Sequence, residues 1–159
     1  MAETEQAAAP RETRAGAPDA IARYCAASSA GDIEALMATF APDPELVSPL
    51  SGRMLFTGRE DLRILLGAIY ATLNDLQWGE PMWAGQSVCV IGRCRVGRLK
   101  LDDAMVFELD ADGLIKRVRP HLRPWLSTTV FALVLGPKIA LHPGVVMRAL
   151  RAYSSGARR

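Results

Sequence analysis

The chain has 159 residues, of which half are hydrophobic, with a formal net charge of +2 and three cysteines. This length supports one domain with a sizeable core and is short for two. The small charge argues against a duplex-binding surface, so we expect no nucleic-acid partner. Cys25, Cys89 and Cys94 have neither disulfide-framework nor metal-site spacing, so we expect reduced thiols, no metal and no cofactor.

The first 17 residues are rich in Ala, Glu, Thr and Pro and show no apolar periodicity. Such a segment does not bury enough apolar surface to offset the entropy of ordering it, so we predict a disordered leader at residues 1–17. Residues 1–16 also lack the apolar stretch of a signal peptide. Together with the reduced thiols, this predicts a cytoplasmic protein.

Helical patterns follow the leader. Residues 18–30 predict a helix that carries Tyr24 on its apolar face and ends at Gly31. Asp32 is the predicted cap of a second helix, which runs to Phe40 and is ended by the prolines that follow. After a short strand at residues 45–50, a further helix is predicted from Gly58 to Asn74, with Leu66 on its apolar stripe. Residues 78–84 predict another strand, broken by Pro81.

Residues 87–125 alternate between apolar and polar side chains, interrupted near Gly97 and at residues 110–113, which predicts three antiparallel strands. One face of the middle strand carries Leu99, Leu101, Asp103, Met105, Phe107 and Leu109. If Leu109 and Leu114 close the second hairpin, Met105 lies opposite Val118 and Asp103 opposite Pro120, and the apolar face continues to Leu122. The alternative is an irregular strand in which Asp103 faces solvent.

The other face of the last strand aligns Arg117, Arg119, His121 and Arg123. With Cys89, Ile91 and Val106 as an apolar centre, this face predicts a homodimer through the outer side of the sheet. The alternative is a solvated face with weak salt bridges.

Residues 125–135 are apolar on all sides, followed by Gly136 and Pro137, which predict the end of this helix, and by a second helix at residues 143–153. A run of about ten residues is half of what a bilayer span needs. We therefore expect a pocket lid or a dimer cover, with peripheral membrane contact as the alternative.

Several motifs occur in an order typical of one superfamily: Ala22-Arg23-Tyr24, Ala30-Gly31-Asp32-Ile33-Glu34-Ala35, Phe40-Ala41-Pro42-Asp43, Gly58-Arg59-Glu60-Asp61 and Asp110-Ala111-Asp112-Gly113-Leu114-Ile115. Over residues 18–122 the chain resembles the nuclear transport factor 2-like superfamily, which includes ketosteroid isomerases, SnoaL-like cyclases and limonene epoxide hydrolases. The resemblance implies an α+β cone, with N-terminal helices in the concavity of a strongly bent antiparallel sheet. It implies a SnoaL/NTF2-like domain at residues 18–124 and an apolar helical extension at 125–159.

The resemblance also assigns roles. Tyr24 matches the oxyanion-binding Tyr of the isomerases, whereas Ser48 stands in the place of their base and Met105 in that of their second acid. Phe40 and Leu66 stand where partners of that Tyr often carry hydroxyl groups. Epoxide hydrolases of the superfamily need an acid/base set on neighbouring strands, and the equivalent inward positions here are Gly97 and Pro120, which supply neither an acid nor a base. The chain thus lacks the isomerase base, because a serine alone does not remove a proton from carbon.

We therefore predict a pocket that binds a small apolar molecule, with Asp103 and Tyr24 as catalytic residues of an isomerase, cyclase or hydratase. An inward carboxyl group has the raised pKa that such catalysts need. The expected ligand-binding residues are Ser48, Met105, Phe107, Val118, Leu122, Phe40 and Leu66. The alternative is a binding or dimerisation module without catalysis.

Overall fold

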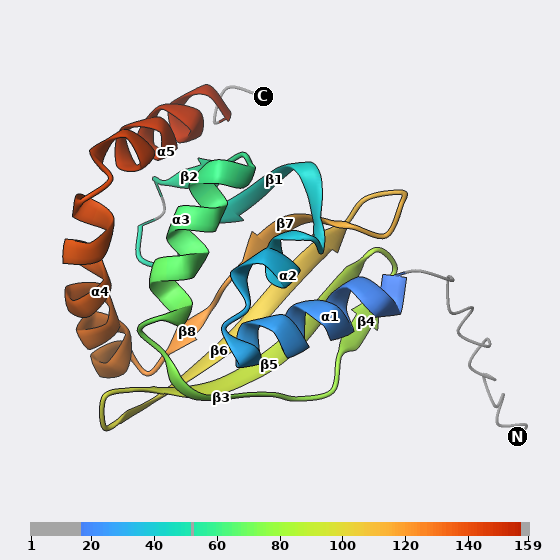
Figure 1. Ribbon diagram of the computed structural model, residues 1–159, viewed down its shortest axis with the longest axis horizontal. Coiled ribbons are helices and arrows are strands. Elements are labelled where there is room, and N and C mark those ends of the chain that lie inside the picture. Colours follow the sequence, from blue (N-terminus) through green and yellow to red (C-terminus); the bar gives the residue numbers. More distant parts are fainter. Residues whose placement is uncertain (1–16, 52, 157–159) are drawn as a thin grey trace, which may run out of the picture.

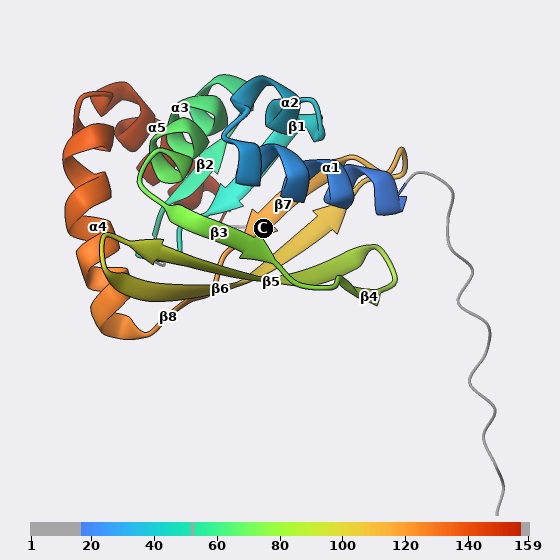
Figure 2. The same cartoon turned by 60° about the horizontal axis from the view of Figure 1, so that its bottom comes forward.

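The computed structural model describes residues 17–51 and 53–156. One bent eight-stranded sheet forms the body of the molecule, and α1 (Ala17–Ala30), α2 (Ile33–Met37) and α3 (Arg59–Tyr70) cover its concave face (Figure 1). Among the described residues, no helix lies across the centre of the opposite face (Figure 2). The predicted α+β architecture is confirmed. The predicted leader lies outside the described residues, except that Ala17 begins α1.

The strands are β1 (Phe40–Val47), β2 (Leu55–Thr57), β3 (Asn74–Trp78), β4 (Met82–Ala84), β5 (Ser87–Val96), β6 (Leu99–Leu109), β7 (Ile115–Arg119) and β8 (Leu122–Arg123). Their order is β2-β1-β7-β6-β5-β3, with β4 beside β5 and β8 beside β6. All pairs are antiparallel except β1 with β7, which is parallel. The predicted three-stranded unit is therefore present as β5, β6 and β7.

The β6–β7 hairpin keeps the predicted faces but not the predicted register. Asp103 pairs with Leu122 rather than with Pro120. The hairpin closes one residue later than predicted, and an irregularity between Glu108 and Leu109 adds a second residue to the shift. Because side chains alternate with a period of two, this even shift leaves each residue on its predicted face.

The second helix is shorter than predicted, because it ends at Met37 and Phe40 already belongs to β1. Pro42 and Pro44 lie inside this strand, where the register with β7 shifts between Phe40 and Glu45. An irregular segment accepts prolines because it has fewer ladder hydrogen bonds to lose. The predicted strand at residues 45–50 is only the end of β1, and β2 was not predicted.

Two further boundaries differ from the prediction. The third helix ends at Tyr70, and Asn74, its predicted end, begins β3. The strand predicted at residues 78–84 is divided, because β3 ends at Trp78 and β4 follows Pro81. Proline lacks the N–H group that would continue the ladder.

Local hydrogen bonds fix the helices that flank β1. Asp32 caps α2 as predicted, since its Oδ1 accepts the N–H of Ala35 at 3.0 Å. The Arg59 guanidinium at the start of α3 donates to the carbonyl oxygens of Met37 at 2.8 Å and Phe40 at 2.9 Å. These bonds tie the corner between α2 and β1 to α3, which positions one wall of the pocket described below.

The last two helices are α4 (Trp125–Ala140) and α5 (Pro143–Gly156), which form one edge of the molecule beside α3 and β2 (Figure 1). α4 continues through Gly136 and Pro137, where the sequence predicted its end. The helix persists because three of its own side chains, those of Phe131, Leu135 and Ile139, are buried on the side that faces the pocket. Pro137 lies on the exposed side. No single helix in the described ranges is long and apolar enough to cross a membrane, although α4 and α5 together, bent by 111°, meet the criteria of length and composition.

An ion pair attaches α5 to α3. Arg148 donates from Nε to Oδ2 of Asp61 at 2.8 Å and from a terminal nitrogen to Oδ1 at 2.5 Å. Asp61 is buried, whereas the Arg148 side chain remains largely exposed. The paired geometry orients α5 and satisfies the buried carboxylate.

Candidate active site

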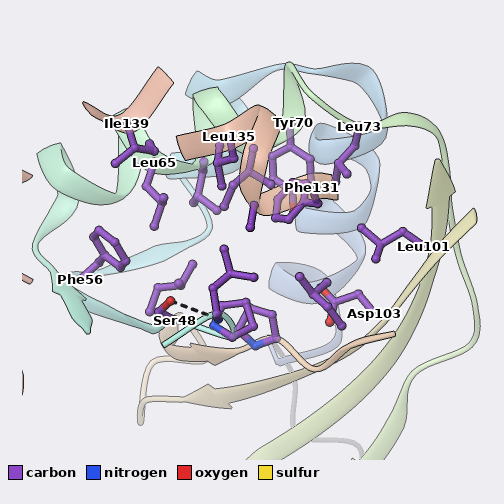
Figure 3. A pocket seen from close by; sticks show the side chains of 18 of the residues that line it. Ser48, Phe56, Leu65, Tyr70, Leu73, Leu101, Asp103, Phe131, Leu135 and Ile139 are labelled. Atoms are coloured by element: carbon purple, nitrogen blue, oxygen red, sulfur yellow. Dashed lines mark hydrogen bonds between the residues drawn. The ribbon is translucent and has the colours of Figure 1, made fainter. Parts of the chain in front are cut away.

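A pocket of about 290 Å³ lies between the concave face of the sheet, α3 and α4. Figure 3 shows Leu65 from α3 and Leu135 and Ile139 from α4 on one side, with Asp103 of β6 and Ser48 after β1 on the other. This volume is near the lower end of the range of about 300–1,000 Å³ that is usual for ligand pockets. The wall is mostly apolar, which suits a small apolar molecule.

Among the described wall residues, hydroxyl or carboxyl groups come from Ser48, Ser51, Tyr70 and Asp103. The two serine hydroxyls accept backbone N–H groups two residues further along, at 3.3 and 3.2 Å, and so stabilise the turn before β2. Tyr70 and Asp103 are therefore the polar groups best placed to act on a ligand.

Asp103 lies on the inward face of β6, paired with Gly92 on one side and Leu122 on the other. It is only 8% exposed. One carboxylate oxygen, Oδ1, accepts the backbone N–H of His121 at 2.8 Å. In the described part of the chain this is the only hydrogen bond of the carboxyl group, so Oδ2 is available to a ligand.

The surroundings of Asp103 bring its pKa close to neutrality. Burial raises the pKa to about 6, while the hydrogen bond from the His121 N–H and the charge of the His121 side chain act in the opposite direction. A carboxyl group with this pKa gives up and takes back a proton easily near pH 7, as general acid–base catalysis requires.

The hydroxyl groups of Tyr70 and Tyr24 form a hydrogen-bonded pair. Tyr70 lines the pocket, and Tyr24 lies behind it. Their oxygens lie 2.6 Å apart, and the Tyr24 hydroxyl also contacts Sδ of Met105 at 3.5 Å. Burial is the main cause that raises the pKa of both tyrosines, and the nearby charge of Asp103 raises it further. Both hydroxyls therefore stay protonated. Either one can be the donor in this pair, and the Tyr70 hydroxyl also interacts with the side chain of Ser28.

Aromatic rings hold Tyr24 in place. Its ring makes edge contacts with Phe40, Tyr70, Trp78 and Phe107 at centroid distances of 4.9 to 6.4 Å. These contacts fill the space between α1 and the sheet, and they leave Tyr24 fully buried.

The ring of Trp78 has a second role, because it lies over Gly92, the residue paired with Asp103. A Cβ at Gly92 would lie 2.8 Å from this ring. Nε1 of Trp78 donates to the Ser28 hydroxyl at 2.9 Å, which fixes the ring against α1. The missing side chain at Gly92 is thus what lets Trp78 close the pocket beside the carboxyl group.

The structure separates the predicted site residues into two groups. Five line the pocket: Asp103, Ser48, Met105, Leu122 and Leu66. Four do not line it and belong to the buried core: Tyr24, Phe40, Phe107 and Val118. The aromatic packing around Tyr24 fills the deep end of the cone, so Tyr70 lines the pocket and Tyr24 does not.

Tyr70 was not predicted as a site residue. The sequence showed it only as a member of the apolar stripe of its helix, since it recurs at the same spacing as Leu62 and Leu66. The α4 segment was predicted to be a lid or a dimer cover built on Trp125, Val130, Phe131 and Val134, and of these Phe131 lines the pocket while Trp125 and Val134 are exposed. In the described part of the chain, no cluster of three or more His, Cys, Asp or Glu side chains could hold a metal ion.

The model of the SnoaL-like domain matches residues 21–118, which is more than half of the chain. No curated protein sequence matches the chain at a significant level.

Crystal structures of other proteins share the fold. A protein conserved in bacteria with a cystatin-like fold, from Silicibacter pomeroyi DSS-3, superposes with a TM-score of 0.77 at 20% identity, over 85% of this chain and 96% of that chain. A steroid delta-isomerase from Pseudomonas aeruginosa has a TM-score of 0.74 at 20% identity, over 82% of this chain and 96% of its own.

A third structure is the epoxide hydrolase/cyclase-like enzyme of pyran ring formation in salinomycin, with a TM-score of 0.58 at 19% identity, over 69% and 92% of the two chains. At such identities these likenesses show a common fold and leave the chemistry open. From the domain match and the fold together, we conclude that this chain belongs to the SnoaL-like family and has the NTF2-like architecture.

Proposed function

We propose that this protein binds a small apolar molecule carrying one polar oxygen, and that Asp103 transfers a proton within it, as in an isomerisation or cyclisation. The observation that carries this proposal is the Asp103 carboxyl group, 8% exposed, in an otherwise mainly apolar pocket of about 290 Å³. Burial of a carboxyl group in such surroundings lowers the stability of the fold, because its charged form loses hydration. Carboxyl groups of this kind are therefore typical of functional sites.

The proposed reaction uses only groups of this chain. The Asp103 carboxylate takes a proton from a carbon next to a carbonyl group, and the electron pair moves onto the carbonyl oxygen. The Tyr70 hydroxyl donates a hydrogen bond to that oxygen, which requires Tyr24 to donate to Tyr70 rather than to Met105 Sδ. Asp103 then returns the proton to another carbon, so that the bound molecule is isomerised without an additional reactant.

The fold relationship with isomerase and cyclase structures is compatible with this chemistry, but the positions differ. By resemblance, the base of ketosteroid isomerases belongs where Ser48 stands, at the end of the first strand. Asp103 lies instead on β6, next to Met105, which occupies the place of the second acid. The substrate would therefore lie against a different wall from that of a ketosteroid isomerase.

We also propose a second copy of the chain as the partner on the outer face of the sheet. There Cys89, Ile91 and Val106 are half-buried although no helix covers them among the described residues. Glu108 binds Arg119 at 2.7 Å and Arg117 at 3.5 Å beside them. Such a surface, apolar at its centre and mixed in charge, can pair with itself. The three free thiols support a reducing compartment, such as the cytoplasm.

Proton transfer can be tested without knowing the substrate. Small apolar ketones and enones are incubated with the protein in D2O, and deuterium incorporation next to the carbonyl group is followed by proton NMR. We expect exchange above the buffer rate for at least one compound, a loss of about a hundredfold or more in Asp103→Asn, and no loss in Asp102→Asn on the other face.

The same compounds are also tested for displacement of a bound apolar dye, Nile red. Binding without any exchange above buffer would contradict the catalytic proposal and favour the non-catalytic binding module. The absence of both binding and exchange would contradict the proposed ligand class as well.

A further inference from the structure

The outer face of α4 exposes large apolar side chains that the fold does not use. Trp125 is 78% exposed, Leu133 70% and Leu141, at the end of the helix, 80%. Trp125, Leu133 and Leu141 are spaced by eight residues, with the exposed Thr129 and Pro137 between them, so they form a row that winds across the outer half of the helix, with Leu133 near its middle. The opposite side of α4 faces the pocket through Phe131, Leu135 and Ile139.

α5, which follows the bend after α4, also exposes large apolar side chains. Met147 is 51% exposed and Leu150 42%, on a face that also carries Arg151. Figure 1 shows both helices at one edge of the molecule, with their outer sides turned away from the sheet. An exposed apolar surface of this kind marks an interaction site rather than an ordinary protein surface.

The charges of this segment all have one sign. From Trp125 onward the sequence contains no Asp or Glu and five basic residues, namely Lys138, Arg148, Arg151, Arg158 and Arg159. The segment before it contains all 17 acidic residues of the chain. Arg148 is paired with Asp61 of α3, and Lys138 Nζ donates to the Thr72 hydroxyl at 2.8 Å, so the segment keeps a net positive charge beside its exposed apolar side chains.

We propose that the outer face of α4 and α5 docks on an anionic lipid surface. Exposed Trp and Leu side chains insert at the boundary between head groups and acyl chains, and basic residues are attracted to anionic head groups. Trp is favoured at that boundary because its ring has an apolar body and a polar N–H.

A second copy of the chain fits this face less well. In a two-fold contact the same patch lies on both subunits, so the net positive charge of this segment in one copy would face that of the other, and Asp61 of α3 is already paired with Arg148. The outer face of the sheet, which carries both Glu108 and its arginines, does not have this difficulty. The docking proposal does not depend on the chemistry proposed for the pocket.

The test is cosedimentation of the full chain with large unilamellar vesicles. Vesicles of phosphatidylcholine alone are compared with vesicles of phosphatidylcholine and phosphatidylglycerol at about 3:1. We expect binding to the anionic vesicles, weaker binding to the neutral ones, and a loss of binding in high salt, because salt screens the attraction.

The double variant Leu133→Ser/Leu141→Ser should bind at least about tenfold more weakly, since each inserted apolar side chain contributes to membrane affinity. The matched control is Met82→Ser/Trp83→Ser, which removes exposed apolar side chains, 53% and 37% exposed, at the far end of the sheet (Figure 2). This control should bind like the unchanged protein. Circular dichroism and Nile red binding show that each variant is folded.

Three results would overturn the proposal: no binding to anionic vesicles, equal binding of the double variant and the unchanged protein, or an equal loss in the control. A fourth would assign the face to a second copy instead. In that case the mass of the particle measured by sedimentation equilibrium is lower for Leu133→Ser/Leu141→Ser, and the unchanged protein does not bind to the vesicles.

Discussion

The hydroxyl oxygens of Tyr24 and Tyr70 lie 2.6 Å apart, although the two residues are 46 positions apart in the sequence and belong to α1 and α3. Tyr24 is buried behind the pocket and Tyr70 lines it. In the proposed reaction, Tyr70 donates to the ligand and Tyr24 orients the Tyr70 hydroxyl.

The two tyrosines should therefore respond differently to loss of their hydroxyl groups. Each of Tyr24→Phe and Tyr70→Phe should cost about 1 kcal/mol in the free energy of unfolding, because each breaks the same hydrogen bond. Tyr70→Phe should also lower the deuterium exchange rate by about a hundredfold, and Tyr24→Phe by about tenfold at most. Denaturant unfolding and proton NMR measure the two effects. Unchanged exchange in Tyr70→Phe would remove that residue from the mechanism.

The stability of the protein should depend on pH through Asp103. Its pKa is about 6 in the folded protein, above the ordinary value of 3.8, so the folded state favours the protonated form. The resulting cost is absent at low pH, grows as pH rises between about 4 and 6, and is complete above pH 6. Asp103→Asn removes this cost and should stabilise the protein by up to about 3 kcal/mol at pH 7.5.

Denaturant unfolding of Asp103→Asn and of the control Asp102→Asn, each at pH 4.5 and pH 7.5, measures this difference. The stabilisation should shrink at the lower pH for Asp103→Asn only. An equal gain in the free energy of unfolding at both pH values would mean that the pKa of the Asp103 carboxyl group is not near 6.

The protein should not isomerise 5-ene-3-ketosteroids at an enzymatic rate, despite its structural likeness to a steroid delta-isomerase. By resemblance, Ser48 occupies the place of the base, and a serine hydroxyl is too weak a base for a proton on carbon. The absorbance of the conjugated product measures turnover. Rapid turnover that persists in Ser48→Ala would refute this account of the position.

Removal of α4 and α5 should damage the domain and not merely shorten it. Phe131 and Leu135 are buried against the pocket, and burial of each such side chain contributes about 1.5–3 kcal/mol. The loss of α5 also leaves the buried Asp61 carboxylate without Arg148. A chain that ends at Pro124 should bind the dye ANS and aggregate, whereas a chain that ends at Tyr153 should behave like the full protein. A stable, soluble shorter form would contradict the role of α4 as a pocket wall.

The proposed dimer should depend on the outer face of the sheet. Val106→Glu places a charge at the apolar centre of that face and should convert the dimer into a monomer, because an unpaired charge is costly to bury. Arg98→Glu, on the exposed turn between β5 and β6, is the control and should leave the dimer intact. Sedimentation equilibrium measures both. A monomer in the unchanged protein would reject this interface.

The sequence predicted the β5–β6–β7 unit well because alternation of apolar and polar residues depends only on neighbouring positions. Asp103 faces inward as predicted, even though its strand partner is Leu122 and not Pro120. The register depends on an irregularity next to Leu109, which leaves no clear trace in the pattern. An even shift preserves the face of a side chain but changes its neighbours.

Other features depend on contacts between distant segments. Tyr70 looked like an ordinary member of an apolar stripe, because only the fold shows that it reaches both Tyr24 and the pocket. Pro137 looked like the end of a helix, since the packing of Leu135 and Ile139 that maintains α4 cannot be seen locally. Tyr24 was expected in the pocket because of the resemblance, whereas aromatic packing encloses it.

The titration of the Asp103 carboxyl group tests the central claim most directly. Its carbon-13 resonance can be assigned by its disappearance in Asp103→Asn and followed by NMR from pH 3 to pH 9. We predict a midpoint at about pH 6, as burial in the apolar pocket requires. A midpoint at about 3.8, the ordinary value of an aspartate, would place the group in contact with water and contradict its role in proton transfer.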